Sequence, residues 1–403
     1  LLMNFFLLII VLVSSSFACD DSLPMKSEVE DLRVLAMVSN PPEIHINTLT
    51  QWESAHVTFD ALVVNPRKSR VNYTWQFCPV ESEKGCRDIE NLLPAWDDSY
   101  SELGLYCGIV LGNSSEPPAA PTAISEERWN ALLTELQTLY QTKLSGTLVP
   151  VMSDPATIRY SIPSFDVTFP QDLGLFHCVN NLFGTPSGWW PSALLTVSDD
   201  DKTLLAQKRV TLSISDLADP AKSAFFAGAF GLPLCSDEVT TDCIEYKNSG
   251  SEENSLNLNP QFSTIQKSEN DLASSSFCDL TGPLIQNDCE LSLPLSVEAK
   301  KPFRLKPILT AESQQRYQVI ETNLDEQKLE INNRVEELSI SWFATDGDIQ
   351  EEITWPKFTK TLDTTWEPPK EKPTENDGRI WLWMVARDQR GGVAWFEIPL
   401  VME

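Results

Sequence analysis

The chain has 403 residues, 42% of them hydrophobic, which is enough for two or three domains that each bury a core. Its 58 acidic and 30 basic residues give a net charge of −28. So acidic a chain excludes nucleic acid as a partner and argues against a domain lying flat on anionic lipid, because the phosphate groups would repel it.

The first 18 residues are predicted to be a signal peptide. Residues 5–13 form an uninterrupted apolar run that has the length of a signal-peptide core and is too short to cross a bilayer. Ala18 and Cys19 follow, a pattern that resembles the lipobox of bacterial lipoproteins. The resemblance implies cleavage before Cys19 and acylation of that cysteine by a fatty acid such as palmitate, with residues 19–30 as a flexible tether. The alternative is an ordinary secretory signal, with Cys19 in a disulfide.

Cysteine use indicates an oxidising compartment. Nine cysteines are present, and an even eight remain once Cys19 is assigned to the lipid. Proximity in the sequence favours four disulfides, Cys78–Cys86, Cys235–Cys243, Cys278–Cys289 and Cys107–Cys178. Zinc is the competing use of these residues, but the sequence has no Cys-x-x-Cys motif and only three histidines. We therefore expect no metal site and no cofactor.

Residues 31–215 are predicted to form a first β-sandwich. Its expected strands are 32–38, 56–63 and 71–77, with a closing hairpin of 193–197 and 208–214. Alternate residues of the third strand are apolar, and Trp75 is the expected core aromatic residue, as on the central strand of a seven-stranded sandwich.

A long gap between the third strand and the closing hairpin predicts an insertion at about residues 79–190. It is expected to be partly helical and disulfide-bonded, since Ser125 can cap a helix with acidic residues in its first turn. Residues 160–169 are predicted to form one or two strands. The adjacent Trp189 and Trp190 could stack on a sugar ring, although such pairs more often cover a domain face.

Residues 216–255 are predicted to be a linker, and residues 256–403 repeat the sandwich plan. The expected strands are 303–309, a short one around 317–320, 338–342 with Trp342 in the core, and a closing hairpin of 379–386 and 393–401. The restart at residues 259–265 echoes residues 40–44, because both carry Asn-Pro before a short strand.

The closing hairpin carries the most specific site prediction. Strand alternation places Trp381, Trp383 and Trp395 on one face, opposite Leu382 and Phe396. If exposed, these three indoles would form a candidate binding face that needs a partner. The alternative is that the linker or the first domain covers them.

Short motifs at 73–75, 341–347 and 388–392 resemble those of Ig-like and PKD-like domains. Together with Arg33-Val34-Leu35, Asn40-Pro41-Pro42 and the segment 387–395, they make most of the chain similar to uncharacterised exported lipoproteins of myxobacteria and related lineages. We therefore expect a mainly β fold with two Ig-like β-sandwich domains, the first carrying the insertion. The resemblance transfers no catalytic residue.

A non-catalytic function is predicted, because the Gly-x-Ser-x-Gly, His-Glu-x-x-His and phosphate-loop motifs do not occur in the sequence. We expect a lipid-anchored protein of the cell envelope, at the outer membrane or on the periplasmic face, that acts in adhesion, scaffolding or assembly. Its partners would be the membrane, through Cys19, and an unknown envelope protein or glycan.

Two other functions stay open. One is a carbohydrate-binding surface protein that uses exposed tryptophans, and the other is a hydrolase with a pair of carboxylates. The acidic turns at 199–201 and 346–348 could bind calcium, but Asp and Gly are favoured at such turns for backbone reasons.

Overall fold

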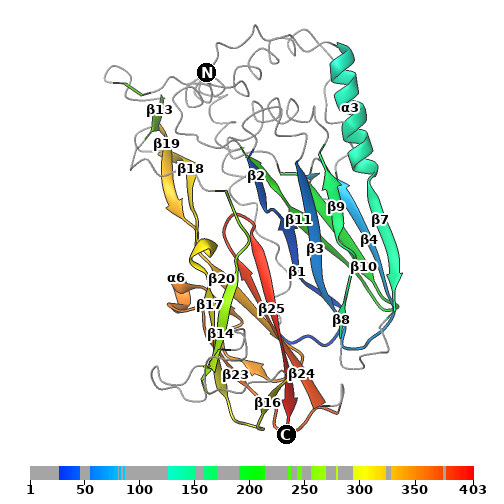
Figure 1. Ribbon diagram of the computed structural model, residues 1–403, viewed down its shortest axis with the longest axis vertical. Coiled ribbons are helices and arrows are strands. Elements are labelled where there is room, and N and C mark those ends of the chain that lie inside the picture. The colour runs from blue at the N-terminus through cyan, green and yellow to red at the C-terminus, as the bar shows by residue number, and fades with distance from the viewer. Residues whose placement is uncertain are drawn as a thin grey trace.

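Two immunoglobulin-like β-sandwiches make up most of the described chain (Figure 1). The computed structural model describes residues 27–45, 55–79, 81–82, 85–86, 126–149, 158–169, 190–213, 235–236, 243–246, 256–268, 278–279, 294–323, 328–374 and 378–403. The mainly β fold class predicted from the sequence is confirmed. Within these residues, no helix has both the length and the apolar content needed to cross a membrane.

The first sandwich contains two antiparallel sheets. One sheet consists of β1 (Arg33–Asn40), β3 (His56–Val64), β8 (Arg159–Tyr160) and β9 (Phe165–Thr168), with β3 pairing all the others. The other has the order β11 (Thr203–Arg209), β10 (Ser192–Ser198), β4 (Val71–Cys78) and β7 (Lys143–Leu148). The predicted alternation of β4 is observed: Trp75 is fully buried between the sheets and stacks on Phe165, with 5.8 Å between ring centroids.

Smaller elements close the ends of this sandwich. They are α3 (Glu126–Gln141), the parallel pair β2 (Glu43–His45) and β12 (Thr211–Ser213), and the short pair β5 (Glu81–Ser82) and β6 (Gly85–Cys86). The helix predicted from Ser125 is therefore present. It begins with two acidic residues, which suits the dipole, and buries Leu136 and Leu139 in the core of the first sandwich.

Two sequence predictions for this sandwich need correction. The predicted insertion at 79–190 includes β7, β8 and β9, yet β7 pairs with β4 and the other two pair with β3. These strands therefore belong to the sandwich. The last hairpin strand was predicted at 208–214, but β11 starts at Thr203, because a tight turn pairs Thr203 directly with Ser198.

The second sandwich has the same plan. One sheet has the order β15 (Cys278–Asp279), β14 (Phe262–Ser268), β17 (Phe303–Leu309), β23 (Thr364–Glu367) and β21 (Asp348–Ile349). The other has the order β16 (Leu295–Val297), β25 (Val393–Met402), β24 (Arg379–Arg387), β20 (Ser339–Ala344) and β22 (Ile353–Thr354). Trp342 on β20 and Trp366 on β23 are buried between the two sheets. Trp342 thus has the surroundings in this sandwich that Trp75 has in the first.

A separate three-stranded sheet projects from the second sandwich (Figure 1). It has the order β13 (Cys243–Tyr246), β19 (Lys328–Val335) and β18 (Arg316–Asn323). The sequence predicted only a short strand around 317–320 and placed 243–246 in a linker, because neither segment has a long apolar alternation. The predicted Cys235–Cys243 disulfide is confirmed, with a Cα–Cα distance of 5.0 Å. Two short helices, η3 (Ala311–Ser313) and α6 (Pro356–Thr359), complete the described elements.

The chain before β1 is fixed to the second sandwich, contrary to the prediction of a flexible tether at 19–30. The Val29 N–H donates to the Ala344 carbonyl at 2.8 Å, and the Ala344 N–H donates to the Ser27 carbonyl at 2.9 Å. The Ser27 hydroxyl also donates to Glu352 at 2.8 Å, and the Val29 side chain is buried. We call residues 27–30 the N-terminal strap. Residues 19–26 lie outside the described residues.

Candidate functional site

A third apolar cluster joins the two sandwiches. The β1–β3 sheet contributes Leu35, Ala36, Leu62 and Val64, the β20–β24–β25 sheet contributes Phe343, Trp383, Val385 and Val393, and Ile158 and Val29 complete the buried set. We call this cluster the interdomain layer. Because each of these two sheets also lines a sandwich core on its other face, the two sandwiches form a stack of four sheets separated by three apolar layers.

The candidate binding face of three tryptophans lies in the interdomain layer. The predicted alternation holds, since Leu382 is in the core of the second sandwich while Trp383 faces the first. Trp383 is fully buried and donates to Glu397 Oε2 at 2.9 Å. Trp381 stacks on Trp383, and the Arg159 guanidinium lies over Trp395, 5.9 Å from its ring centroid. The first sandwich therefore covers Trp383 and leaves Trp381 and Trp395 partly buried, which agrees with the predicted alternative that the first domain covers this face.

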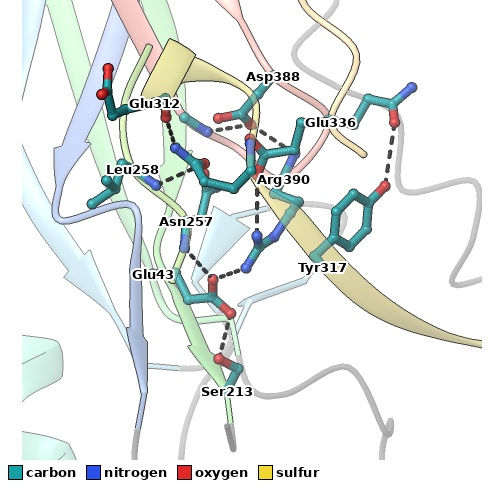
Figure 2. A network of polar contacts seen from close by, with 12 residues as sticks. Glu43, Ser213, Asn257, Leu258, Glu312, Tyr317, Glu336, Asp388 and Arg390 are labelled. Atoms are coloured by element: carbon teal, nitrogen blue, oxygen red, sulfur yellow. Dashed lines mark hydrogen bonds and ion pairs between the residues drawn. The ribbon is translucent and has the colours of Figure 1, made fainter. Parts of the chain in front are cut away.

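A buried charged cluster lies at one end of the interdomain layer (Figure 2). Its centre is Arg390, in the turn between β24 and β25, which forms ion pairs with Glu43 of β2 and with Glu336 just after β19, the latter at 3.1 Å. The side chains of Arg390, Glu43 and Glu336 are only 12%, 5% and 0% exposed. We call this cluster the charged joint, because its three central residues come from both sandwiches and from the β18–β19 hairpin.

Other donors complete the bonding of the two carboxylates. Glu43 accepts hydrogen bonds from the Asn257 N–H at 2.8 Å and from the Ser213 hydroxyl, and Glu336 accepts one from the Gln315 N–H at 2.9 Å. The Arg390 guanidinium also lies over the Tyr317 ring, 5.0 Å from its centroid. Buried charges persist only when they are paired and hydrogen-bonded in this way, so the joint binds three segments of the chain together.

The turn that presents Arg390 has a strict local geometry. One carboxylate oxygen of Asp388 accepts from the N–H groups of Arg390 at 2.8 Å and Gly392 at 2.7 Å. Gly391 has a φ of 97°, and a Cβ at Gly392 would overlap Asp388 Oδ2. Gly391 is therefore favoured by its backbone conformation, and Gly392 by the close approach of the Asp388 side chain. From the first sandwich, Lys208 donates to the Gly391 carbonyl.

Burial is the main influence on the pKa values of two acidic residues in and beside the charged joint. Burial raises the pKa of Glu336 to about 7, although the Gln315 N–H and the Arg390 guanidinium oppose the change. Burial also raises the pKa of Asp388, against the hydrogen bonds from Gly392 and Arg390. Because one guanidinium is shared between two carboxylates, it offsets only part of the free-energy cost of removing each carboxylate from water. The joint is thus a clamp whose buried charges are costly to desolvate.

The remaining predicted site residues are scattered. Trp190 is partly buried just before β10, and Cys78 is disulfide-bonded. Cys278 lies in β15 and Cys86 in β6. Cys19, Cys107, Cys178, Cys289 and Trp189 lie outside the described residues.

The two acidic turns have structural roles. Although burial opposes its ionisation, hydrogen bonds from the Lys202 and Asp201 N–H groups and from Ser69 and Asn65 lower the pKa of Asp199. In the second turn, Asp346 accepts from the Gly347 N–H at 2.7 Å, where Gly347 has a φ of 84°. Among the described residues, no group of three histidine, cysteine or acidic side chains is placed to hold a metal ion.

Sequence reasoning missed the charged joint, because its partners are far apart in the chain. The interdomain layer did have a sequence signal. Residues 34–37, 61–64 and 382–386 are apolar without interruption, as expected of strands buried on both faces. The fold and the joint define a class of protein: a double Ig-like sandwich whose domains are locked to each other.

Comparison with known proteins adds little to this description. No protein-family model matches the sequence, and a search of curated proteins finds no match. Among solved structures, Escherichia coli alpha-2-macroglobulin activated by porcine elastase is 8% identical with a TM-score of 0.21, and the alignment covers 93% of this chain but 35% of that one.

Two further structures align over most of this chain. A bacterial ice-binding adhesin is 7% identical with a TM-score of 0.17, and the alignment covers 93% of this chain and 100% of that one. Extracellular domains 3–5 of Drosophila OTK are 9% identical with a TM-score of 0.14, with the same two coverages of 93% and 100%. These TM-scores are too low to bear on function.

Proposed function

We propose that this chain is an exported, non-catalytic protein of the cell envelope that is held to a membrane through acylated Cys19 and acts as a rigid scaffold or adhesion component. The observation that supports this proposal is the interdomain layer closed by the charged joint. Two domains joined only by a linker would move independently. Here a buried Trp383 and a buried ion-pair cluster hold them in one orientation. A partner bound on one sandwich would therefore be held in a fixed direction.

The use of the acidic residues favours a non-catalytic role over the hydrolase alternative. Glu43 and Glu336 are only 4% and 1% exposed and share Arg390, so they are not open to a substrate. The carbohydrate-binding alternative is also weakened, because the indole of Trp383 is covered by the first sandwich. Both observations favour the scaffold or adhesion function.

The membrane anchor is tested by metabolic labelling with an alkynyl fatty acid, followed by detergent phase separation. We expect the wild-type chain to take up the label and to enter the detergent phase. The Cys19→Ser variant should do neither, because it lacks the acylated sulfur. A labelled, membrane-bound Cys19→Ser variant would contradict the anchor.

The scaffold role is tested by cross-linking in intact membranes. We expect one recurrent envelope component to be cross-linked to the anchored wild-type chain and lost with Cys19→Ser, which keeps the folded domains but frees them from the membrane. The role would be wrong if no component were cross-linked and the purified chain instead turned over a glycoside, ester or peptide probe.

A further inference from the structure

In the part of the chain that the structure describes, one broad sheet face of this acidic protein carries no acidic side chain. The sheet β11–β10–β4–β7 turns one face to the core of the first sandwich and the other away from the second sandwich (Figure 1). In the three rows nearest the β10–β11 turn, the outward side chains are those of Asn72, Thr74, Gln76, Lys143, Ser145, Thr147, Leu194, Thr196, Ser198, Thr203, Leu205 and Gln207, of which Leu194 is buried. We call these twelve residues the neutral face. Lys143 is its only charged member. The next outward row adds Ser192 and the exposed, positively charged Arg209.

This neutrality distinguishes the face from the outer sheet at the other end of the stack. The equivalent outward positions of β17 and β23 carry Arg304, Lys306 and Glu367. A chain with 58 acidic residues would ordinarily place some of them on an exposed strand face. Their exclusion from twelve neighbouring positions is what a surface needs if it is to meet another acidic body.

The neutral face also has ordered side chains and apolar edges. The Ser145 hydroxyl donates to Thr74 Oγ1 at 3.1 Å, and the Thr147 hydroxyl donates to Asn72 Oδ1 at 2.8 Å. Leu205 on edge strand β11 is 63% exposed, and Val149, at the end of edge strand β7, is 68% exposed. An apolar side chain therefore projects at each edge of a polar, uncharged centre.

We propose that two copies of this chain associate through their neutral faces, about a twofold axis parallel to the strands. Each copy carries a charge of −28, so contact between acidic surfaces would be repulsive. The neutral faces avoid this repulsion and can pack as aligned sheets. The twofold axis brings the β11 edge of one copy over the β7 edge of the other, which covers Leu205 in both copies. A glycan is the less suitable occupant, because the twelve residues of the neutral face include no aromatic side chain on which a sugar ring could stack.

The size of the face predicts a weak complex. Four strands and three rows of outward residues span on the order of 400 Å² per copy, about half of the roughly 800 Å² that a stable complex buries on each partner. We expect a Kd on the order of 0.1 mM in solution. Copies held on one membrane would exceed this local concentration, but the association itself does not depend on the proposed anchor.

Sedimentation equilibrium of the exported chain over a wide concentration range tests the proposal. We expect reversible dimers in the wild type and at least about tenfold weaker association in Thr74→Glu, because the twofold axis places two like charges close together. Ser145→Glu, at an exposed edge position, is the second variant if Thr74→Glu fails to fold. The matched control is Thr264→Glu, on the outer face of β14, which should dimerise like the wild type.

Three results would overturn the proposal. The first is a wild-type chain that stays monomeric at millimolar concentration. The second is a dimer that Thr264→Glu weakens as much as Thr74→Glu does. The third is binding of a neutral glycan that is lost in Thr74→Glu while self-association is unchanged, which would give the neutral face a different occupant.

Discussion

Arg390 forms ion pairs with two buried carboxylates, those of Glu43 and Glu336, which are far apart in the sequence. Replacing it with alanine would leave Glu43 and Glu336 buried without their cation. Breaking a buried pair in this way costs about 3–5 kcal/mol. We therefore expect Arg390→Ala to lower the free energy of unfolding by that amount, as measured by denaturant titration at neutral pH.

The matched control for this prediction is Arg67→Ala. Arg67 forms an ion pair with Asp201 at 3.0 Å, but the two side chains are 55% and 71% exposed. Such exposed pairs contribute at most about 1 kcal/mol. If both arginine variants lost the same small amount of stability, the charged joint would not be a stabilising clamp.

Glu336 makes stability depend on pH. Because burial raises its pKa to about 7 in the folded chain, the folded state binds the proton more tightly than the unfolded state. The stabilisation by this proton is complete below the ordinary pKa of glutamate and is lost as the pH rises through about 7. We expect the stability of Glu336→Gln, which is neutral at every pH, to rise relative to that of the wild type by about 2.5 kcal/mol between pH 5 and 8.

Denaturant titrations of the two proteins across this pH range measure that difference. Glu298→Gln, at an exposed position far from the joint, corrects for the general effect of removing one acid from a highly acidic chain. A stability difference between Glu336→Gln and wild type that stayed constant with pH would show that the carboxyl group is ionised throughout.

At the scale of elements, the strap makes a local prediction. The amides of Val29 and Ala344 both donate across the strap, so they should exchange slowly with solvent. Val29→Ala removes buried methyl groups and should cost about 2 kcal/mol. Amide hydrogen exchange should then be faster at Ala344, while amides of β4 in the first sandwich stay protected. Unchanged exchange at Ala344 would mean that the strap is not held by this contact.

The elements differ in how far they could be predicted from the sequence. β4 was predicted closely because alternate residues of it are apolar, and the β24–β25 hairpin because a Gly-containing turn sets its register. β7 and the β18–β19 hairpin were missed or underestimated. β7 is a polar edge strand with alternating exposed residues, and its pairing with β4 depends on chain that is distant in sequence.

The same limit applies to the candidate site. Arg390 and Glu43 are 347 residues apart, and no local pattern relates them. The tryptophan stripe was placed on the correct face of its hairpin, because strand alternation is a local property. Whether that face would be exposed or covered depended on the packing of a second domain. Only the uninterrupted apolar runs of β1, β3 and β24 carried that information.

For the molecule as a whole, the interdomain layer predicts coupled unfolding. Trp383 is fully buried at its centre, and replacing a buried tryptophan with alanine costs about 3–5 kcal/mol. In calorimetry we expect one transition for the wild type and two for Trp383→Ala, because each sandwich keeps its own core when the layer between them is lost.

Trp342→Ala is the informative comparison for Trp383→Ala. It removes a tryptophan of similar burial from the core of the second sandwich, so it should lower the melting temperature without separating the two transitions. Two transitions already present in the wild type would contradict the coupling of the sandwiches.

The N-terminal strap also determines how the molecule would respond to mechanical tension. A pull applied ahead of Ser27 would first load its two backbone hydrogen bonds with Ala344, which belong to the second sandwich. Until those bonds break, the force enters the second sandwich without passing through β1, although β1 is the first strand along the chain. The second sandwich, which comes later in the sequence, is thus the first domain to be loaded by a pull on the N-terminal side of Ser27.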